Sequence, residues 1–159
     1  MTSTPQPMAL RYFRTLARWP GGRWLFARAV CFKAPYFSSI RPRFLELKPG
    51  LCQVALRKRR AVQNHMGSVH AIAMANLCEL AAGTLMEVTI PLTMRWIPRG
   101  MTIEYLRRAA TDVSATARLD KSGWGPPENV GVPVTITDVA GDEVVRAVIT
   151  MYVSERRSG

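Results

Sequence analysis

Several side chains able to do acid–base or hydrogen-bond chemistry fall within a short stretch, among them Asn64, His65, His70 and Glu79. Glu79 is the most informative of them, because apolar residues flank it on both sides. A carboxylate is almost never fully buried without a partner or a function. Burial also disfavours the charged form of a carboxyl group, which tunes a general base towards neutral pH. Glu79 is therefore a candidate general base. Alternatively, Glu79 has a purely structural role and forms an ion pair with one of the many arginines. The periodicity of the sequence does not decide between these two roles.

Glu79 lies on the longest predicted helix, which runs from Ser68 to Met86. This segment is apolar nearly all round, a pattern typical of a helix that is buried on most sides. Its many alanines allow a sheet to wrap closely around it, and Ser68 is the expected N-cap. The candidate base is thus predicted to sit on the core helix of the domain.

If His70 and Glu79 both lie on this helix, they cannot meet within one chain. Nine residues of α-helix rise by about 13 Å and turn by about 900°, which places the two side chains on opposite faces. A site that uses both must therefore lie across a two-fold interface. An isologous dimer of this kind carries two equivalent sites.

The segments around the helix alternate apolar and polar residues, as half-buried strands do. The loop from 121 to 131 is rich in glycine and proline and separates two of them. One long helix wrapped by one antiparallel sheet is an α+β fold. The predicted strands are 44–48 and 51–57 before the helix, and 92–97, 101–107, 113–120, 132–139 and 143–154 after it.

The first 39 residues are predicted to form a basic helical extension to a domain spanning 40–159. Residues 1–7 are expected to form a disordered tail, followed by helices over 8–18 and 23–32. The first helix has an apolar stripe, and its arginines lie on the other side. It either touches lipid weakly as a surface helix or covers one edge of the domain. The stripe consists of Met8, Tyr12, Leu16 and Trp19.

The net charge of +11 is concentrated in the first part of the chain. Residues 1–60 hold 13 basic residues and one acid, whereas residues 61–159 hold 9 basic residues and 10 acids. Such a surface suits a phosphorylated cofactor, an acidic carrier protein or an anionic lipid surface. Nucleic acid is not the expected partner, because aromatics are not interleaved with the basic strands and no zinc or glycine-rich motif is present. The basic run 57–60 is then a solvated strand end rather than a nuclear or nucleic-acid address.

The three cysteines are odd in number and far apart in the sequence. They predict neither a disulfide scaffold nor a metal site, so no cofactor and no metal are expected. We expect reduced thiols in a cytoplasmic protein. We also expect no membrane-spanning segment and no secretory signal.

The approach to the helix resembles the signature of hotdog-fold acyl-CoA thioesterases. That pattern has a polar amide, a glycine, a histidine, a small residue and an acid, and the chain has Asn64, Gly67, His70, Ala71 and Glu79 at these positions. The segment 101–109 also looks like the strand that follows the helix in that family. The resemblance covers about residues 40–155 and implies a hotdog fold. The N-terminal helices are similar to an extension found in an uncharacterised branch of this superfamily, whose members are assigned as thioesterases by similarity alone.

The resemblance implies a role for each position. Glu79 would activate water or attack as the nucleophile. The Ala71 backbone N–H at the helix N-terminus would polarise the thioester carbonyl, and Asn64 would donate a second hydrogen bond. His70 would orient the thioester or hold the loop. Gly67 would contact substrate in the same turn.

Two positions depart from the pattern of the family, and two arginines are expected to bind the substrate outside the reaction centre. Ala71 stands where the family usually has glycine. Gly83 stands where many relatives carry serine or threonine, so the neighbouring Thr84 is the candidate polar group. Arg107 and Arg108 are expected to reach the phosphates of coenzyme A.

The expected function is hydrolysis of acyl-CoA or acyl-carrier-protein thioesters in fatty acid metabolism, by a homodimer or a dimer of dimers. One alternative is a hotdog protein that binds acyl chains without turnover. Another is a 3-hydroxyacyl dehydratase that uses His65 and Glu79, although the proline and glycine typical around that histidine are missing.

Overall fold

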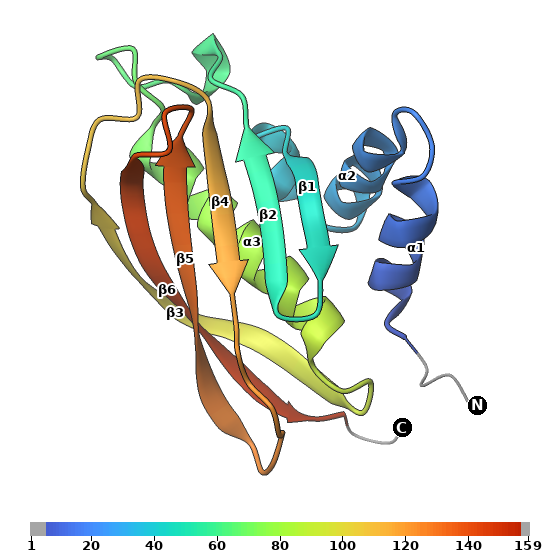
Figure 1. The fold of residues 1–159 in the computed structure, drawn as a ribbon. Helices are drawn as coiled ribbons and strands as arrows, with labels where there is room; N and C mark the ends of the chain where they lie inside the picture. The colour runs from blue at the N-terminus through green and yellow to red at the C-terminus, as the bar shows by residue number, and fades with distance from the viewer. Residues whose placement is uncertain (1–5, 157–159) are drawn as a thin grey trace.

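The computed structural model describes residues 6–156, so five residues of the expected N-terminal tail lie outside it. Two helices lead into a strand hairpin, then one long helix, then four more strands (Figure 1). The α-helices are α1 (Met8–Leu16), α2 (Gly22–Lys33) and α3 (Ala71–Thr89), with short 3-10 turns η1 (Pro35–Ser39) and η2 (Arg60–Val62). The strands are β1 (Arg43–Lys48), β2 (Leu51–Leu56), β3 (Met94–Tyr105), β4 (Val113–Arg118), β5 (Glu128–Asp138) and β6 (Glu143–Glu155).

The six strands form one antiparallel sheet in the order β1-β2-β4-β5-β6-β3. The sheet curves around α3, as Figure 1 shows. This is the hotdog fold, and the predicted α+β class is confirmed.

The sheet differs from the expectation at two points. The segments 92–97 and 101–107 are one strand, β3, because a bulge between Pro98 and Gly100 carries the ladder with β6 past the proline. β3 is an edge strand, where a residue without an N–H costs no ladder bond. The loop expected over 121–131 is shorter, because Glu128 to Gly131 already pair with β6.

The helix α3 fills the concave side of the sheet, and its core residues are almost completely buried. By length and composition it could cross a membrane, but 67% of its most apolar window is buried within the domain, as in a core helix. The Thr89 hydroxyl accepts a hydrogen bond from the Gly50 N–H and donates one to the Leu85 carbonyl. The end of α3 is therefore tied to the β1–β2 turn.

The N-terminal helices share their core with the sheet. The rings of Phe13, Phe26 and Phe44 pack edge to face at centroid distances of 5.2 and 5.0 Å, which joins α1, α2 and β1. The predicted apolar stripe of α1 is only partly correct. Leu10 and Phe13 are the buried residues, while the stripe residues Met8, Tyr12 and Trp19 are exposed and Leu16 is half-buried. Trp19 lies beyond the end of the helix.

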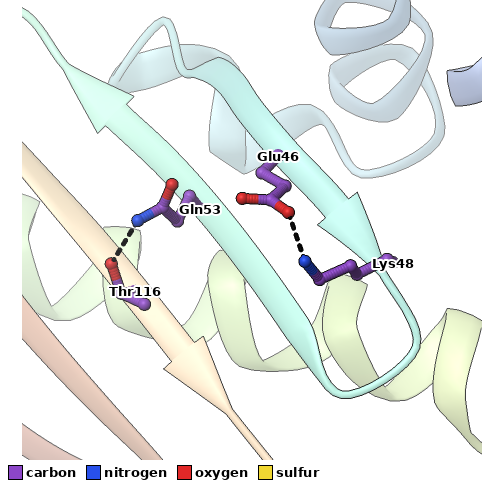
Figure 2. A network of polar contacts seen from close by, with 4 residues as sticks. All are labelled: Glu46, Lys48, Gln53 and Thr116. Carbon is purple, nitrogen blue, oxygen red and sulfur yellow. Dashed lines mark hydrogen bonds and ion pairs between the residues drawn. The ribbon is translucent and has the colours of Figure 1, made fainter.

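The strands β1, β2 and β4 carry polar side chains between their buried positions. Glu46 and Lys48 form an ion pair of 2.6 Å on β1, and Gln53 donates to Thr116 at 3.1 Å between β2 and β4 (Figure 2). Because Cys52, Val54 and Leu56 alternate with these positions and are fully buried, the polar groups belong to the outer face.

Candidate active site

The turn before α3 is organised by the side chain of Asn64. Its Oδ1 accepts hydrogen bonds from the N–H groups of Met66 (3.0 Å) and Ser68 (3.1 Å). Gly67 has a φ of 71°, a left-handed conformation that a glycine adopts without strain. The Nδ2 of Asn64 has no acceptor among the described residues, so it is free to donate to a ligand.

His70 is the N-cap of α3, not Ser68 as expected. Its extended backbone directs Nδ1 to accept a hydrogen bond from the Ile72 N–H at 3.1 Å. The Ser68 hydroxyl instead accepts from Arg108 Nε at 2.8 Å. Because Nδ1 is an acceptor, the neutral imidazole carries its proton on Nε2. The Nε2–H is thus a donor on an exposed side chain.

The N–H of Ala71 is one of the free donors that a helix N-terminus always leaves. No hydrogen bond within residues 6–156 uses it. The Tyr105 hydroxyl donates to the Ala71 carbonyl at 3.2 Å. Burial raises the pKa of Tyr105, which keeps this hydroxyl protonated and donating. The end of β3 therefore holds the first turn of α3 in place.

Arg107 and Arg108 have different surroundings. Arg108 binds the turn, through Ser68 Oγ and through the Met66 carbonyl. Arg107 forms an exposed ion pair of 3.3 Å with Asp142. Only Arg107 is thus held by a partner that a phosphate can readily displace, since an exposed ion pair is worth little.

Glu79 lies in the wall of a large cavity of about 770 Å³. Glu79 is half-buried. No hydrogen bond or ion pair within the described residues involves its carboxylate, and the structural ion-pair alternative finds no support. Apolar side chains of α1, α2 and η1 form the facing walls of the cavity.

The same cavity reveals polar groups that the sequence did not single out. Glu87 lies two turns after Glu79 on the same face of α3, and its Oε2 accepts a hydrogen bond from Trp96 Nε1 at 3.2 Å. The Trp96 ring lies against Gly83, where a Cβ would come within 2.8 Å of Cη2. Thr84 also lines the cavity. The sequence signal for this placement is the spacing of eight residues between Glu79 and Glu87, which puts both side chains on one face of a helix.

The structure places His70 and Glu79 at separate cavities. His70 lines a smaller cavity of about 190 Å³, together with the buried Asn76, whose Nδ2 donates to Ser39 Oγ. Glu79 lines only the larger cavity. His65 lies exposed in the turn and lines neither of these two cavities, so the structure does not bring it to Glu79.

The three cysteines are buried thiols without disulfides. Burial raises the pKa of Cys78 to about 12 and also raises those of Cys52 and Cys31. These thiols are protonated at neutral pH, which makes them poor nucleophiles. Within residues 6–156, no three side chains of the metal-binding types gather at one place.

Solved structures of thioesterase-family proteins have the same hotdog architecture. A Pseudomonas aeruginosa protein of unknown function, described as a probable thioesterase, is 23% identical with a TM-score of 0.73, and the match covers 82% of this chain and 94% of that one. A thioesterase family protein from Silicibacter pomeroyi is 16% identical with a TM-score of 0.70, over 82% of this chain and 96% of that one.

A more similar structure, a structural-genomics crystal structure whose name states no function, is 45% identical with a TM-score of 0.82. That match covers 94% of this chain and 99% of the other. The model of a family described as a domain of unknown function, DUF4442, matches residues 22–153, and the chain belongs to this family. No curated protein matches the chain.

Proposed function

We propose that the protein hydrolyses thioesters of coenzyme A or of an acyl carrier protein, with Glu79 as the general base or the nucleophile. One observation carries the proposal: Glu79 presents a half-buried carboxylate, with no partner among residues 6–156, at the wall of an apolar cavity. The thioesterases among the structural neighbours support the same reaction class.

As a base, Glu79 takes a proton from a water molecule whose oxygen attacks the thioester carbonyl carbon. The negative charge then develops on the carbonyl oxygen, where the Ala71 N–H and Asn64 Nδ2 donate hydrogen bonds. Collapse of this intermediate breaks the carbon–sulfur bond, and the proton held by Glu79 passes to the leaving thiolate. As a nucleophile, the Glu79 carboxylate would attack the carbonyl carbon and expel the thiolate as the carbon–sulfur bond breaks, which leaves a mixed anhydride between Glu79 and the acyl group. Water then hydrolyses this anhydride to the free acid and the Glu79 carboxylate, and the proton that water releases passes to the thiolate.

The donors and the base are proposed to come from two subunits. Support comes from the separate cavities of His70 and Glu79 and from the free edge of the sheet at β3. An unpaired edge strand is a template for pairing with a second chain. Three apolar side chains of β3 are exposed there: Ile97, Met101 and Tyr105. A dimer through this edge buries them, and dimers can associate further.

A second candidate function is acyl binding without turnover. It is favoured by the same cavity, and by Gly83, which stands where the resemblance predicts a hydroxyl group. The dehydratase alternative has no comparable support, because His65 lies in the exposed turn.

The test is thiol release from a panel of acyl-CoAs by the parent protein and by Glu79→Gln. The substitution keeps the shape of the side chain but removes its ability to accept a proton. We expect turnover to fall by about 10² or more, the usual contribution of a general base. Glu46→Gln is the matched control, because it removes only an exposed ion pair on the outer face of the sheet (Figure 2).

Two outcomes would contradict the proposal. If Glu79→Gln hydrolyses acyl-CoA as fast as the parent, Glu79 is neither base nor nucleophile. If the parent binds acyl-CoA but releases no thiol from any member of the panel, acyl binding without turnover replaces hydrolysis. A thermal melt of each variant separates loss of chemistry from loss of folding.

A further inference from the structure

The large cavity has one wall that belongs to the hotdog core and another that does not. α3 contributes Glu79, Gly83 and Glu87 at intervals of four residues, which places them on one face over a rise of about 12 Å. The facing wall is built by the N-terminal helices α1 and α2, which lie beside β1 at the edge of the sheet in Figure 1. The cavity therefore exists only because these helices cover this part of the domain.

The facing wall is made almost entirely of apolar side chains. Three of them are large and remain exposed although they line the cavity: Met8 at 66%, Tyr12 at 59% and Leu25 at 50%. Exposed apolar surface gathered around a concavity indicates a binding site. An apolar occupant would cover all three side chains and would remove this surface from water.

We propose that α1 and α2 form the wall of a pocket for a medium or long acyl chain, and that this wall selects chain length. This inference rests on the proposed function, because it takes the bound chain to be the acyl part of a thioester. The volume of about 770 Å³ lies in the range of small-molecule pockets, which runs from about 300 to 1,000 Å³.

The position of Glu79 gives the chain its direction. The carboxylate lies on the α3 wall, so a thioester carbonyl placed beside it leaves the chain to extend along the apolar wall of α1 and α2. No charged group of α1 lines the cavity, and α2 contributes only Lys33 near its C-terminal end. A chain in this position gains affinity with each methylene group that it buries.

The substitution Ala29→Trp tests the wall. Ala29 is exposed on α2 and lines the cavity, so a larger side chain narrows the pocket without entering the core. Thr15→Trp is the matched control, because Thr15 is exposed on α1 and does not line the cavity. A thermal melt establishes that both variants fold.

Two readouts are measured for the parent and both variants. The first is the ratio of kcat/KM for palmitoyl-CoA to that for butanoyl-CoA. The second is the Kd of cis-parinaric acid, a fluorescent long-chain fatty acid whose binding needs no turnover. For Ala29→Trp, we expect the ratio to fall and the Kd to rise by about tenfold, equivalent to two methylene groups no longer buried. Thr15→Trp should match the parent in both.

The outcomes separate this inference from the proposed function. If thioesters are hydrolysed but Ala29→Trp alters neither readout, the wall does not hold the acyl chain and the inference is overturned. If no thioester is hydrolysed but parinaric acid binds and Ala29→Trp weakens it, the chain pocket stands and hydrolysis fails. If parinaric acid does not bind to the parent or to Glu79→Gln, the cavity is not a chain pocket.

Discussion

Gly83 and Trp96 explain, at the scale of single residues, why the site departs from the thioesterase pattern. The resemblance predicts a hydroxyl side chain four residues after the acid, and here the Trp96 ring occupies that space. The indole N–H is directed to Glu87, which anchors the ring in this position. Thr84, the next residue along the helix, is the hydroxyl that remains at the cavity wall.

Gly83→Ala is expected to destabilise the protein by about 1 to 3 kcal/mol, the usual cost of overpacking a core. The added Cβ would lie 2.8 Å from Trp96 Cη2, so the ring must move away from Glu87. Urea unfolding measures the loss, and the tryptophan emission of the folded state should shift.

Gly125→Ala is the control, because a Cβ there meets nothing within 4 Å. Equal stability of the two alanine variants would show that Trp96 adjusts freely and does not fix this part of the site.

At the scale of elements, the turn between η2 and α3 is held from outside by the segment after β3. Arg108 binds Ser68 and the Met66 carbonyl, while its neighbour Arg107 only pairs with Asp142 at the surface. Adjacent arginines, both expected to bind coenzyme A, thus have separate structural roles. Arg108 is a positioning residue, and Arg107 is the one available to phosphate.

The two arginines should respond differently to the form of the substrate. Arg107→Ala should raise KM for acyl-CoA several-fold and leave hydrolysis of an acyl-N-acetylcysteamine thioester, which has no phosphates, at the parent rate. Arg108→Ala should lower kcat for both substrates, because the turn that carries Asn64 is loosened. Steady-state kinetics with both thioesters measure this. The assignment is wrong if both variants lose activity only with acyl-CoA.

Much of the element structure could be predicted from the sequence, because apolar periodicity sets it. The core helix, the half-buried strands and the turn at Gly50 all follow from such patterns. The N-cap could not be chosen, since Ser68 and His70 are both able to cap, and only the contact from Arg108 assigns the serine elsewhere. The continuity of β3 depends on its edge position, which no local pattern shows.

The candidate site was predicted only in part. Glu79 was identified from its apolar flanks and the turn through a resemblance, whereas the partners of Asn64 and Arg108 depend on the three-dimensional structure. The cavity was not predicted, because it arises where α1 and α2 meet α3, far apart in the sequence. The apolar stripe of α1, which includes Met8 and Tyr12, has the pattern of a buried face but borders this cavity.

At the scale of the whole molecule, the basic N-terminal helices carry an exposed aromatic surface. Residues 1–39 hold six basic residues and no acid. Tryptophan and other aromatic side chains favour the interface between water and lipid, and arginines favour anionic headgroups. The exposed aromatic residues of this segment are Tyr12, Trp19, Trp24, Phe32 and Tyr36. We propose weak contact with an anionic membrane through this surface.

The protein should sediment with vesicles that contain phosphatidylglycerol at low ionic strength, and should be released as salt screens the charges. Phe32→Ser should weaken binding about threefold or more, because the ring is 89% exposed and its apolar surface would be lost to the lipid. Val139→Ser is the control at a position 72% exposed between β5 and β6. Equal binding by both variants, or binding that salt does not affect, would contradict this contact.

The central claim is that each site takes its base from one subunit and its carbonyl donors from the other. It is tested most directly with a purified heterodimer of Glu79→Gln and Asn64→Asp subunits. The second substitution keeps the Oδ1 that organises the turn and removes the Nδ2 donor. Light scattering should give twice the subunit mass of 17.7 kDa, or a multiple of that dimer mass, for every species.

Each homodimer should be almost inactive in thiol release, since both of its sites lack one group. The heterodimer has one site with neither group and one with both, so it should recover about half of the parent activity, as the two-fold symmetry requires. A heterodimer no more active than its two homodimers, or an active monomer, would contradict the shared site.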